Sequence, residues 1–372
     1  MAEGVFWGPN NEAGWRGSIR GADVSRESSD CTSLPRLYLS RPATLLPDIT
    51  LDNETVLSRV RESFRGSASE WDSIAQGITY VLGRCNTQVR YVDPDPTLSP
   101  GEFASRAATA CLWENGVEAS EVDLLVYGGI AREAFEPATA AEVAGRLGAR
   151  PLHAFDVTCA CAGLVEALHV VAGYFALHPE LKTALVCAGE LMRDHVSYDI
   201  QSLEDVALRA AGLTLGNAAA AFLVTREALP AGSARLLGFQ HKTLAEHYDL
   251  CTAPIDGYFM SRSKELFALA VHVPPEIRRL LASVEWSPED VDHYIFHQPS
   301  QAILERVFAE IGARPEACVH THSLYGNTAS TSWAVALNHR LKHGTVENGD
   351  KLVIASAASG FTIVSAAAVW ES

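Results

Sequence analysis

Residues Ala154–Leu168 read AFDVTCACAGLVEAL and contain the clearest change of structure in the chain. The first apolar residues are typical of the end of a strand, and a run of small residues follows them. From Leu164 onward the apolar side chains recur at helical spacing, so a helix is predicted to begin just after Cys161. A helix N-terminus carries about half a positive charge, which favours an anion and predicts a thiol pKa below the usual value of about 8.5. The alternative is a buried cysteine that only fills a tight turn.

The composition is that of a globular protein with a large core. The 372 residues are 48% hydrophobic and 20% charged, which is typical of folded rather than disordered chains. The formal net charge of −16 argues against nonspecific nucleic-acid binding, because that binding depends on cationic side chains. We identify no apolar run of the roughly 18 residues that a membrane span needs, and no secretion signal at the N-terminus. The sequence therefore predicts a cytoplasmic protein with no nucleic-acid or membrane partner.

The cysteines and histidines give no pattern of a metal site. The eight cysteines lack the spacing of a disulfide framework, and no CxxC pair suggests zinc. A reducing compartment fits this usage best. Only His320 and His322 have the spacing of a ligand pair, and no cysteine or carboxylate is grouped beside them. We therefore predict that the protein holds no metal.

An internal repeat runs through the chain. Val117–Tyr127 and Glu285–Phe296 share a helix end, an acidic turn, the pair Val-Asp and an apolar strand. The tetrapeptide Gly-Ala-Arg-Pro occurs at Gly148 and again at Gly312, an offset of 312 − 148 = 164 residues. Matches in the same order at nearly constant offset indicate two similar halves.

Each copy of the repeat alternates strand and helix, which sets the predicted domains. The pattern predicts an α/β fold of two halves with mixed, mostly parallel sheets covered by helices. We assign residues 49–226 to the first half and residues 227–372 to the second. Residues 1–48 are rich in Gly, Ser, Arg and Pro without a clear period, and we interpret them as an N-terminal extension.

The repeat also predicts where a ligand binds. The position equivalent to Cys161 falls at Asn327, since 327 − 161 = 166, in a second small-residue turn that opens a helix. His297 follows the apolar strand of the second copy, and open α/β sheets bind ligands at the carboxyl ends of their strands. We therefore expect the three residues to meet between the halves. Taken singly, His297 has the simpler interpretation of a packed strand-end histidine, and Asn327 that of a common Gly-Asn turn.

Three motifs in this order resemble those of the thiolase superfamily. They are DVTCACAG with Cys161, FHQPS with His297 and GNTAS with Asn327, and they are most similar to the ketoacyl-acyl-carrier-protein synthase III group. Matching stretches cover residues 50–372 and include a glycine-containing loop at Ala358–Thr362. The resemblance implies a five-layered αβαβα fold built from two duplicated halves.

The resemblance also implies a condensing enzyme of the acyltransferase class. Cys161 would attack a thioester and hold its acyl group, with the backbone N–H groups of Cys161 and Ser359 as an oxyanion hole. His297 and Asn327 would donate hydrogen bonds to a malonyl- or β-ketoacyl-type extender during a (decarboxylative) Claisen condensation, as in polyketide or fatty-acid biosynthesis. No cofactor is implied, because the acyl groups arrive on the phosphopantetheine of acyl carrier protein or on coenzyme A.

Some positions depart from the motifs of that group. His297–Ser300 reads His-Gln-Pro-Ser instead of His-Gln-Ala-Asn, and Ala302 replaces an Arg that often contacts a carrier phosphate. Arg306 lies one helical turn later and is a candidate substitute. These changes favour an enzyme of specialised metabolism over a fatty-acid initiator.

Two related functions stay open beside condensation. The first is an acyltransferase that passes the Cys161-bound acyl group to a hydroxyl, an amine or a carrier thiol without forming a C–C bond. The second is a catalytically silent partner, which the presence of all three site residues disfavours. The resemblance further implies a homodimer whose central sheet continues across a twofold axis. We expect the walls of the acyl pocket to come from residues 192–213 and 258–273.

Overall fold

Two sets of strands with the same spatial order carry the repeat. The computed structural model describes residues 34–150, 152–344 and 346–372. The strands of the first half are, in spatial order, β6 (His153–Asp156), β5 (Leu124–Tyr127), β7 (Thr183–Glu190), β8 (Ala218–Thr225) and β1 (Tyr38–Ser40), with β2 (Ala43–Leu45) also paired to β8. Those of the second half are β12 (His293–Phe296), β13 (Lys351–Ala358), β14 (Thr362–Glu371) and β9 (Ser233–Thr243).

The pairing of the strands is also the same in both halves. β5 pairs with β7, and β12 with β13, in parallel. The following pairs are antiparallel in both halves. They are β7–β8 and β8–β1 in the first half, and β13–β14 and β14–β9 in the second. β6 adds a parallel strand beside β5, and in the matching place of the second half Tyr294 and Cys318 form a single parallel bridge. Since β1 also pairs with β9, the halves join into one mixed sheet of ten strands.

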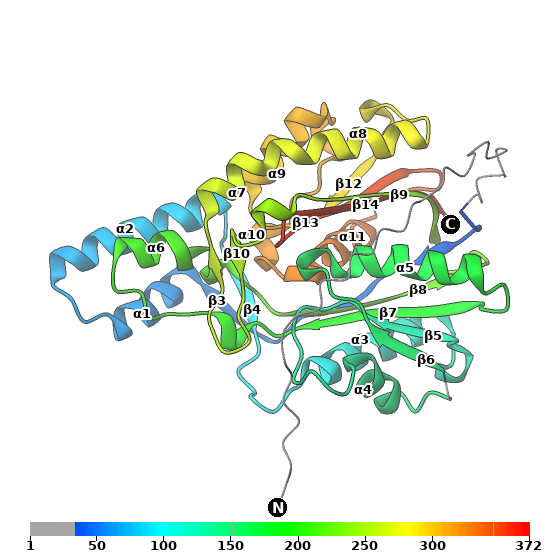
Figure 1. The fold of residues 1–372 in the computed structure, drawn as a ribbon, viewed down its shortest axis with the longest axis horizontal. Coiled ribbons are helices and arrows are strands. Elements are labelled where there is room, and N and C mark those ends of the chain that lie inside the picture. The colour runs from blue at the N-terminus through cyan, green and yellow to red at the C-terminus, as the bar shows by residue number, and fades with distance from the viewer. Residues whose placement is uncertain (1–33, 151, 345) are drawn as a thin grey trace, which may run out of the picture. The chain divides into compact units, whose positions relative to one another are not determined.

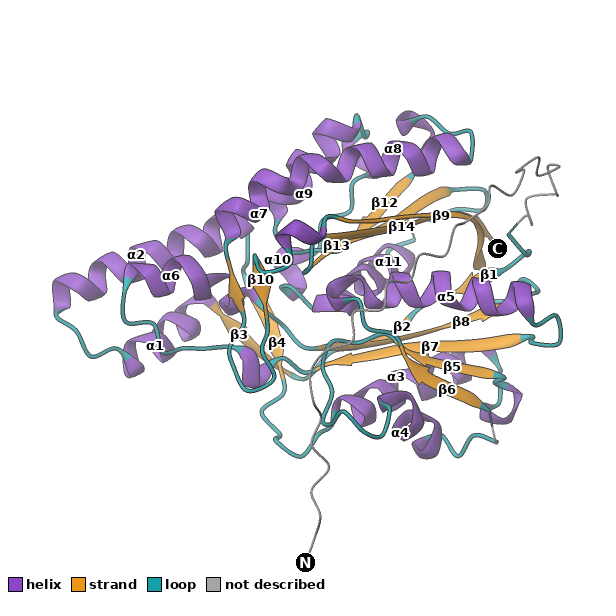
Figure 2. Cartoon of the chain, in the orientation of Figure 1, coloured by secondary structure: helices purple, strands orange, loops and turns teal. Residues whose placement is uncertain are grey.

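Helices cover both outer faces and fill the space between the halves, as Figures 1 and 2 show. The outer face of the first half is covered by α3 (Pro100–Asn115) and α4 (Thr139–Arg146). The outer face of the second half is covered by α8 (Val273–Ser283) and α9 (Gln301–Ile311). The middle layer consists of α5 (Gly163–Leu177) and α11 (Ser332–Lys342), which share a core with strands of both halves. The predicted five-layered αβαβα fold of two duplicated halves is confirmed. The strands are mixed as predicted, but the expectation of mostly parallel pairing is wrong, because antiparallel pairs outnumber parallel ones in the described sheet.

The apolar character of α5 follows from its place in the middle layer. Residues 160–177 form an 18-residue helical segment with a mean hydropathy of 1.6, which is long and apolar enough to cross a membrane. The expectation that no apolar run reaches this length is therefore wrong. In the structure Leu164, Leu168 and Val171 are fully buried between the strands of the two halves. A helix that packs on two sides in a core needs this composition without any membrane.

A further group of helices and hairpins stands at one end of the sheets, at the left of Figure 1. It comprises α1 (Asn53–Ser63), α2 (Ala68–Cys85), α6 (Leu203–Arg209) and the hairpin of β3 (Ile49–Asp52) with β4 (Val89–Val92). The shorter elements β10 (Cys251–Thr252), β11 (Met260–Ser261), α7 (Ser263–Leu269) and α10 (His322–Tyr325) complete the described fold. Local sequence sets the ends of α2, because Ser67 and Glu70 form a capping box before it and Asn86 adopts the left-handed conformation after it.

The first two strands correct the predicted boundary of the N-terminal extension. Residues 34–48 belong to the folded domain, because β1 lies between β8 and β9, and Leu39 within it and Leu37 just before it are completely buried. β1 and β2 are three residues long and flanked by prolines, so neither offers enough alternation for a strand prediction. Residues 1–33, the rest of the predicted extension, lie outside the described residues. The predicted boundary between the halves, at residues 226 and 227, falls in the loop between β8 and β9.

Candidate active site

A cavity of about 1040 Å³ brings the three predicted site residues together. Cys161, His297 and Asn327 all line it, although they come from three motifs that are far apart in the sequence. The predicted meeting of these side chains between the two halves is therefore what the structure shows. Ser359, from the turn between β13 and β14, lines the same cavity.

Several parts of the chain line this cavity besides the turns that carry Cys161, His297, Asn327 and Ser359. Residues within both predicted segments, 192–213 and 258–273, contribute to the walls. The sequence did not indicate the contributions of α2, of the loop at residues 130–135, of residues 251–255 and of the turn at residues 299–303. Most of the wall is apolar, so the cavity suits a ligand with a hydrocarbon part.

Local geometry holds Cys161 at the start of α5. The residue lies in the single 3₁₀ turn η2 (Ala160–Ala162), where Ala160 has a φ of 45° in the left-handed region. Gly163 approaches the strand-end backbone so closely that a Cβ atom there would lie 2.1 Å from the Gly128 carbonyl oxygen. The Ser356 hydroxyl donates a hydrogen bond to the Cys161 carbonyl oxygen at 2.9 Å, which ties the turn to the second half. The run of small residues therefore permits a turn that larger side chains would block.

The predicted lowering of the Cys161 pKa is wrong for the resting protein. Burial raises the pKa of the Cys161 thiol far above its usual value, and the nearby Cys251 and Glu190 act in the same direction. The thiolate would lose its hydration in the protein, and the free-energy cost of this loss outweighs the stabilisation that the partial positive charge of the helix start provides. Cys161 is therefore a neutral thiol near pH 7, and a base has to take its proton when it reacts.

His297 continues the line of β12 into the cavity, where it is 4% exposed. Its backbone N–H donates to the Ala355 carbonyl oxygen at 2.8 Å, so the pairing of β12 with β13 fixes its position. Its Nδ1 lies 2.6 Å from the Ser332 Oγ, which also accepts the Gln298 N–H at 3.1 Å. The hydroxyl has one hydrogen and one further lone pair left, so it can serve either neutral tautomer of the ring. Burial, with a contribution from the nearby His322, lowers the pKa of His297 to about 3.

Asn327 presents the donor end of its amide to the cavity. The Ala329 N–H donates to Asn327 Oδ1 at 3.0 Å, which fixes the amide orientation and leaves Nδ2 as the free end. The backbone of Asn327 pairs with the strand entry at Thr214 and Gly216 through two hydrogen bonds of 2.9 Å. The preceding Gly326 has a φ of 71°, and a Cβ there would lie 2.7 Å from the Thr214 carbonyl oxygen. Only glycine fits this approach, so the Gly-Asn pair is required by geometry.

The structure moves the repeat equivalent of Cys161 away from Asn327. A second 3₁₀ turn, η9 (Ala329–Thr331), precedes α11 just as η2 precedes α5. Ala329 has a φ of 51°, which matches the left-handed Ala160 of the first turn. The residue in the place of Cys161 is therefore Ser330, at an offset of 330 − 161 = 169 residues. Asn327 lies three residues earlier and reaches the cavity from a different part of the turn.

Glu190, which was not predicted from the sequence, is a buried carboxylate beside the site. It has no solvent exposure and accepts hydrogen bonds from the Ile130 and Ala131 N–H groups, at 2.9 and 3.1 Å, and from the Ser330 hydroxyl. Burial raises its pKa above the ordinary value. The carboxylate thus links a loop of the cavity wall to the turn of the second half. The available signal was a charged residue at the end of the otherwise apolar strand TALVCAGE.

Cationic side chains also line the cavity, but the predicted phosphate contact is not among them. Arg84, Arg132 and Lys264 contribute to the wall. Arg306, the candidate substitute for the arginine that Ala302 replaces, donates instead to the Phe267 carbonyl oxygen at 2.7 Å and to Glu310 at 2.9 Å. Arg306 does not line the cavity, and its role as a carrier contact stays a prediction.

The histidine pair considered for a metal has other contacts. Both ring nitrogens of His322 face partners, Thr87 Oγ1 at 2.7 Å and the Gln298 carbonyl oxygen at 2.8 Å. Burial lowers the pKa of His322 to about 4. In the ranges that the structure describes, no three His, Cys, Asp or Glu side chains are placed to hold a metal ion.

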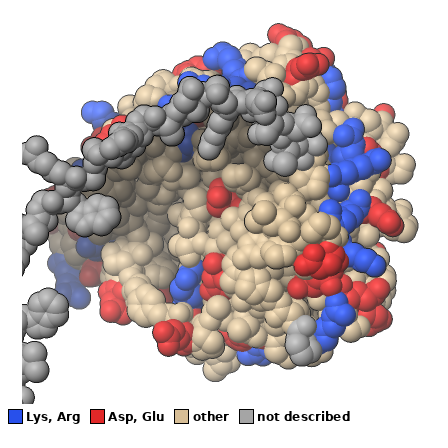
Figure 3. Space-filling view, turned by 45° about the vertical axis from the view of Figure 1, so that its right-hand side comes forward, with Lys and Arg blue, Asp and Glu red and all other residues tan. Residues whose placement is uncertain are grey.

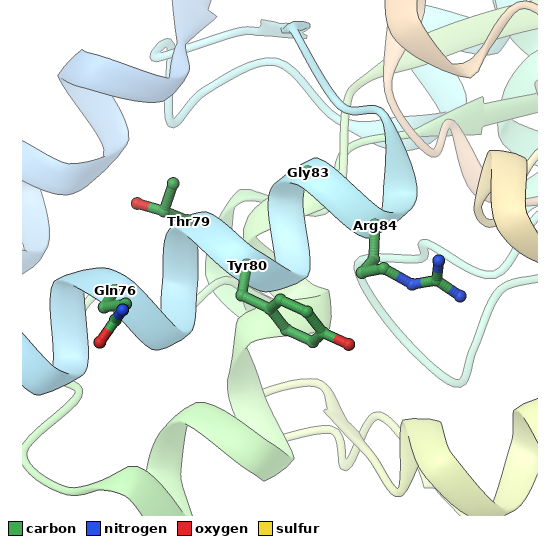
Figure 4. Close-up of a pocket in the computed structure, with 5 residues that line it drawn as sticks. All are labelled: Gln76, Thr79, Tyr80, Gly83 and Arg84. Carbon is green, nitrogen blue, oxygen red and sulfur yellow. The ribbon is translucent and has the colours of Figure 1, made fainter.

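Other surface features offer less chemistry than the large cavity. A shallow depression of about 440 Å³ on α2 is lined by Gln76, Thr79, Tyr80, Gly83 and Arg84, which Figure 4 shows along one helix. It holds no nucleophile beside a base. On the visible part of the face in Figure 3, acidic and basic side chains are interspersed without a broad basic patch of the kind that nucleic acids bind.

Part of each half matches a known family model. The model described as 3-Oxoacyl-[acyl-carrier-protein (ACP)] synthase III matches residues 155–244, and the model of the C-terminal part of that family matches residues 281–370. The first range contains Cys161, and the second contains His297 and Asn327. The two matches therefore include all three motifs.

Curated relatives and solved structures agree with these matches. Beta-ketoacyl-[acyl-carrier-protein] synthase III of Aquifex aeolicus is 27% identical over 286 residues, which cover 76% of this chain and 87% of the relative. Acyl-CoA:acyl-CoA alkyltransferase of Shewanella oneidensis is 28% identical over 306 residues, covering 76% and 86%. The structure of the synthase FabH from Pseudomonas aeruginosa superimposes with a TM-score of 0.76 at 25% identity, covering 91% of this chain and 99% of FabH.

A more distant structure shows the same fold. A cysteine-to-alanine variant of OleA from Xanthomonas campestris superimposes with a TM-score of 0.83 at 20% identity, covering 91% of this chain and 98% of OleA. These similarities agree with the duplicated halves, the five layers and the two family matches. The chain has a thiolase-like fold and resembles β-ketoacyl-acyl-carrier-protein synthase III (KASIII), whose enzymes belong to the acyltransferase class.

Proposed function

We propose that this protein is a condensing enzyme that loads an acyl group on Cys161 and joins it to a second thioester by a Claisen-type condensation. The observation that carries the proposal is one cavity shared by a thiol, an imidazole and an amide donor. The amide of Asn327 is oriented by the Ala329 N–H, and the imidazole of His297 by Ser332. A nucleophile faced by two hydrogen-bond donors suits the transfer of an acyl group to a carbanion.

Loading begins with two neutral groups. The Cys161 thiol has a raised pKa and His297 a lowered one, so neither is charged near pH 7. In the tautomer with its proton on Nδ1, His297 accepts the thiol proton at Nε2 while the sulfur attacks the thioester carbonyl. The carrier thiol then leaves and takes up this proton. The backbone N–H groups of Cys161 and Ser359 are the proposed donors to the carbonyl oxygen during this step.

The second step uses the other tautomer of His297. With the Ser332 hydroxyl donating to Nδ1, the ring carries its proton on Nε2 and can donate it into the cavity. This N–H and the Asn327 amide together hold the second thioester's carbonyl oxygen as it becomes an enolate. Each such donor contributes about 3 kcal/mol to transition-state stabilisation. In a malonyl extender the enolate forms as the bond to the carboxylate carbon breaks and CO2 leaves. The enolate carbon then attacks the acyl-Cys161 carbonyl, and the C–S bond breaks with its electron pair on sulfur, which takes up a proton from solvent.

The cavity wall supports acyl thioesters as substrates. Its apolar side chains, among them Leu215, Phe259 and Phe267, match a hydrocarbon chain, and Arg84, Arg132 and Lys264 are suited to a phosphate of coenzyme A or of a carrier phosphopantetheine. We also propose that the protein is cytoplasmic and forms a homodimer. For the homodimer, β6 is the outer strand of the sheet, with one edge that no described strand covers.

Intact-mass spectrometry with product analysis tests the proposed function. The protein is loaded from lauroyl-CoA, freed of excess substrate and given malonyl-CoA, malonyl-carrier protein or more lauroyl-CoA. We expect the acyl adduct to disappear together with formation of a β-ketoacyl product. If the acyl group leaves only to water, hydroxyl or amine acceptors and no C–C bond forms with any thioester, the condensation proposal is wrong.

A further inference from the structure

A second histidine of the cavity is held in a single tautomer. His195 lines the cavity that contains Cys161, and its Nδ1 lies 2.8 Å from the Gly257 carbonyl oxygen. A carbonyl oxygen only accepts hydrogen bonds, so Nδ1 must carry the proton of the neutral ring. Nε2 then has a free lone pair. His297 differs in that a hydroxyl, that of Ser332, faces its Nδ1, while the backbone of Ala329 also bonds to the ring.

Two hydrogen bonds fix His195 in place. Besides the ring contact with Gly257, its backbone carbonyl oxygen accepts the Phe259 N–H at 2.8 Å. Both partners belong to the loop between β10 and β11. The neighbouring Met192 and Leu215 are buried in one apolar cluster, against which Phe259 packs. The ring therefore has a defined orientation on the cavity wall.

The surroundings of His195 connect it to the proposed reaction. Leu215, in that same cluster, forms a backbone bridge with Asn327, so the wall that carries the second histidine adjoins the amide donor. A base with a free lone pair has no role in holding an enolate oxygen, which needs donors. It is useful where an incoming nucleophile must lose a proton.

We propose that the protein has a second activity, in which His195 accepts the proton of a hydroxyl or amine that takes the acyl group from Cys161. This activity rests on the proposed acylation of Cys161. The acceptor oxygen or nitrogen attacks the thioester carbonyl, and its O–H or N–H proton passes to Nε2 of His195. The C–S bond breaks with its electron pair on sulfur, and the proton then passes from His195 to the Cys161 thiolate. The products are an ester or amide and the free thiol.

Deacylation of the loaded protein tests this activity. Wild-type, His195→Asn and His195→Gln proteins are loaded from lauroyl-CoA and desalted, and the loss of acyl mass is followed in water and in dilute ethanol. The Asn amide can keep a donor near Nδ1 for the Gly257 carbonyl but has no group at Nε2. We expect His195→Asn to load like the wild type and to deacylate about 100- to 10,000-fold more slowly. Added imidazole should restore part of the rate to His195→Asn.

Three results would overturn the proposal. The first is a His195→Asn protein that deacylates at the wild-type rate, and the second is one in which loading and deacylation fall by the same factor, as a purely structural residue predicts. The third is a wild-type acyl-enzyme that neither water nor ethanol discharges. Failure of the wild type to load from any thioester would instead contradict the proposed function itself. The His195→Gln protein, which can place an amide near Nε2 but loses the Gly257 contact, should be slow and gain less from imidazole.

Discussion

Burial makes the Cys161 thiol and the His297 imidazole neutral partners. It raises the pKa of the thiol and lowers the pKa of the imidazole to about 3. A resting thiolate–imidazolium pair would require the opposite shifts. The proton therefore moves when a thioester is present to receive the sulfur, rather than before.

The first prediction concerns the reactivity of Cys161 toward a simple alkylating agent. Because its pKa is raised, the thiolate fraction near pH 7 is small, and the rate of alkylation by iodoacetamide should rise about 10-fold per pH unit through pH 9 without levelling off. Peptide mass spectrometry after timed labelling measures this rate at Cys161 alone. A plateau below pH 8 would mean that the helix start, and not burial, controls the thiol.

The second prediction separates loading from condensation at Asn327. Asn327→Asp has nearly the same shape but replaces the donor Nδ2 with an acceptor oxygen. We expect acyl loading within a few-fold of the wild type and condensation about 100- to 1,000-fold slower, since one donor to the developing enolate is lost. Adduct formation and β-ketoacyl product are measured on the same samples. Equal condensation rates in the variant and the wild type would remove Asn327 from the proposed mechanism.

The site residues divide into those that sequence could predict and those that it could not. Cys161, His297 and Asn327 lie at strand ends and turns whose motifs are local, so their meeting follows from the repeat and the resemblance. Glu190 and His195 acquire their meaning only from tertiary contacts. The hydrogen bonds of the Glu190 carboxylate come from backbone N–H groups of another loop. The tautomer of His195 is set by a carbonyl oxygen 62 residues away. No local pattern carries such information.

At the scale of elements, the start of α5 depends on a glycine that has a matched control in the same helix. A Cβ at Gly163 would meet the Gly128 carbonyl oxygen, whereas a Cβ at Gly173 would have no atom within 4 Å. We predict that Gly163→Ala destabilises the protein by about 1–3 kcal/mol through overpacking and slows loading of Cys161. Gly173→Ala should instead stabilise it by about 0.5–1 kcal/mol, since alanine favours a helix. Urea unfolding and adduct formation measure both effects, and equal behaviour of the two variants would contradict this account of the turn.

The two 3₁₀ turns also show why the repeat offset misplaced one equivalence. A single offset of 166 residues aligns Cys161 with Asn327, but the left-handed alanines place Ser330 there. The halves differ in the lengths of their loops, so a constant offset drifts by a few residues over the repeat. Asn327 nevertheless lines the cavity, because the turn itself, and not the exact position, faces it.

For the whole molecule, buried neutral histidines predict a loss of stability in mild acid. His297 and His322 have pKa values lowered from 6.5 to about 3 and about 4. As the pH falls below about 6.5, the unfolded chain binds these two protons while the folded chain does not, so the free energy of unfolding decreases. Each histidine contributes about 1.4 kcal/mol per pH unit between pH 6.5 and 4. The raised pKa of Glu190 acts in the opposite direction over part of this range.

Urea unfolding at pH values from 7 to 4.5 measures this slope. In His322→Gln one titrating group is removed, so the decline contributed by the histidine pair should be about half as steep, whatever the variant's overall stability. A wild-type stability that stays constant or rises as the pH falls through this window would show that the two rings are protonated in the folded protein.

The architecture of the molecule was predictable because the duplication repeats a whole pattern of strands and helices. The two halves and the five layers follow from that pattern and from the resemblance. β1 was not predictable, since its three residues become a strand only through pairing with β8 and β9. The apolar α5 was equally ambiguous, because composition does not distinguish a helix between two sheets from one in a membrane.

The central claim is that Cys161 is the residue that accepts an acyl group, and intact-mass spectrometry after incubation with lauroyl-CoA tests it most directly. Cys159→Ala and Cys251→Ala serve as matched controls, since both thiols lie close to Cys161. We predict one lauroyl adduct on the wild type and on both controls, and none on Cys161→Ala. An adduct that persists on Cys161→Ala, or that disappears only when Cys159 or Cys251 is replaced, would contradict the claim.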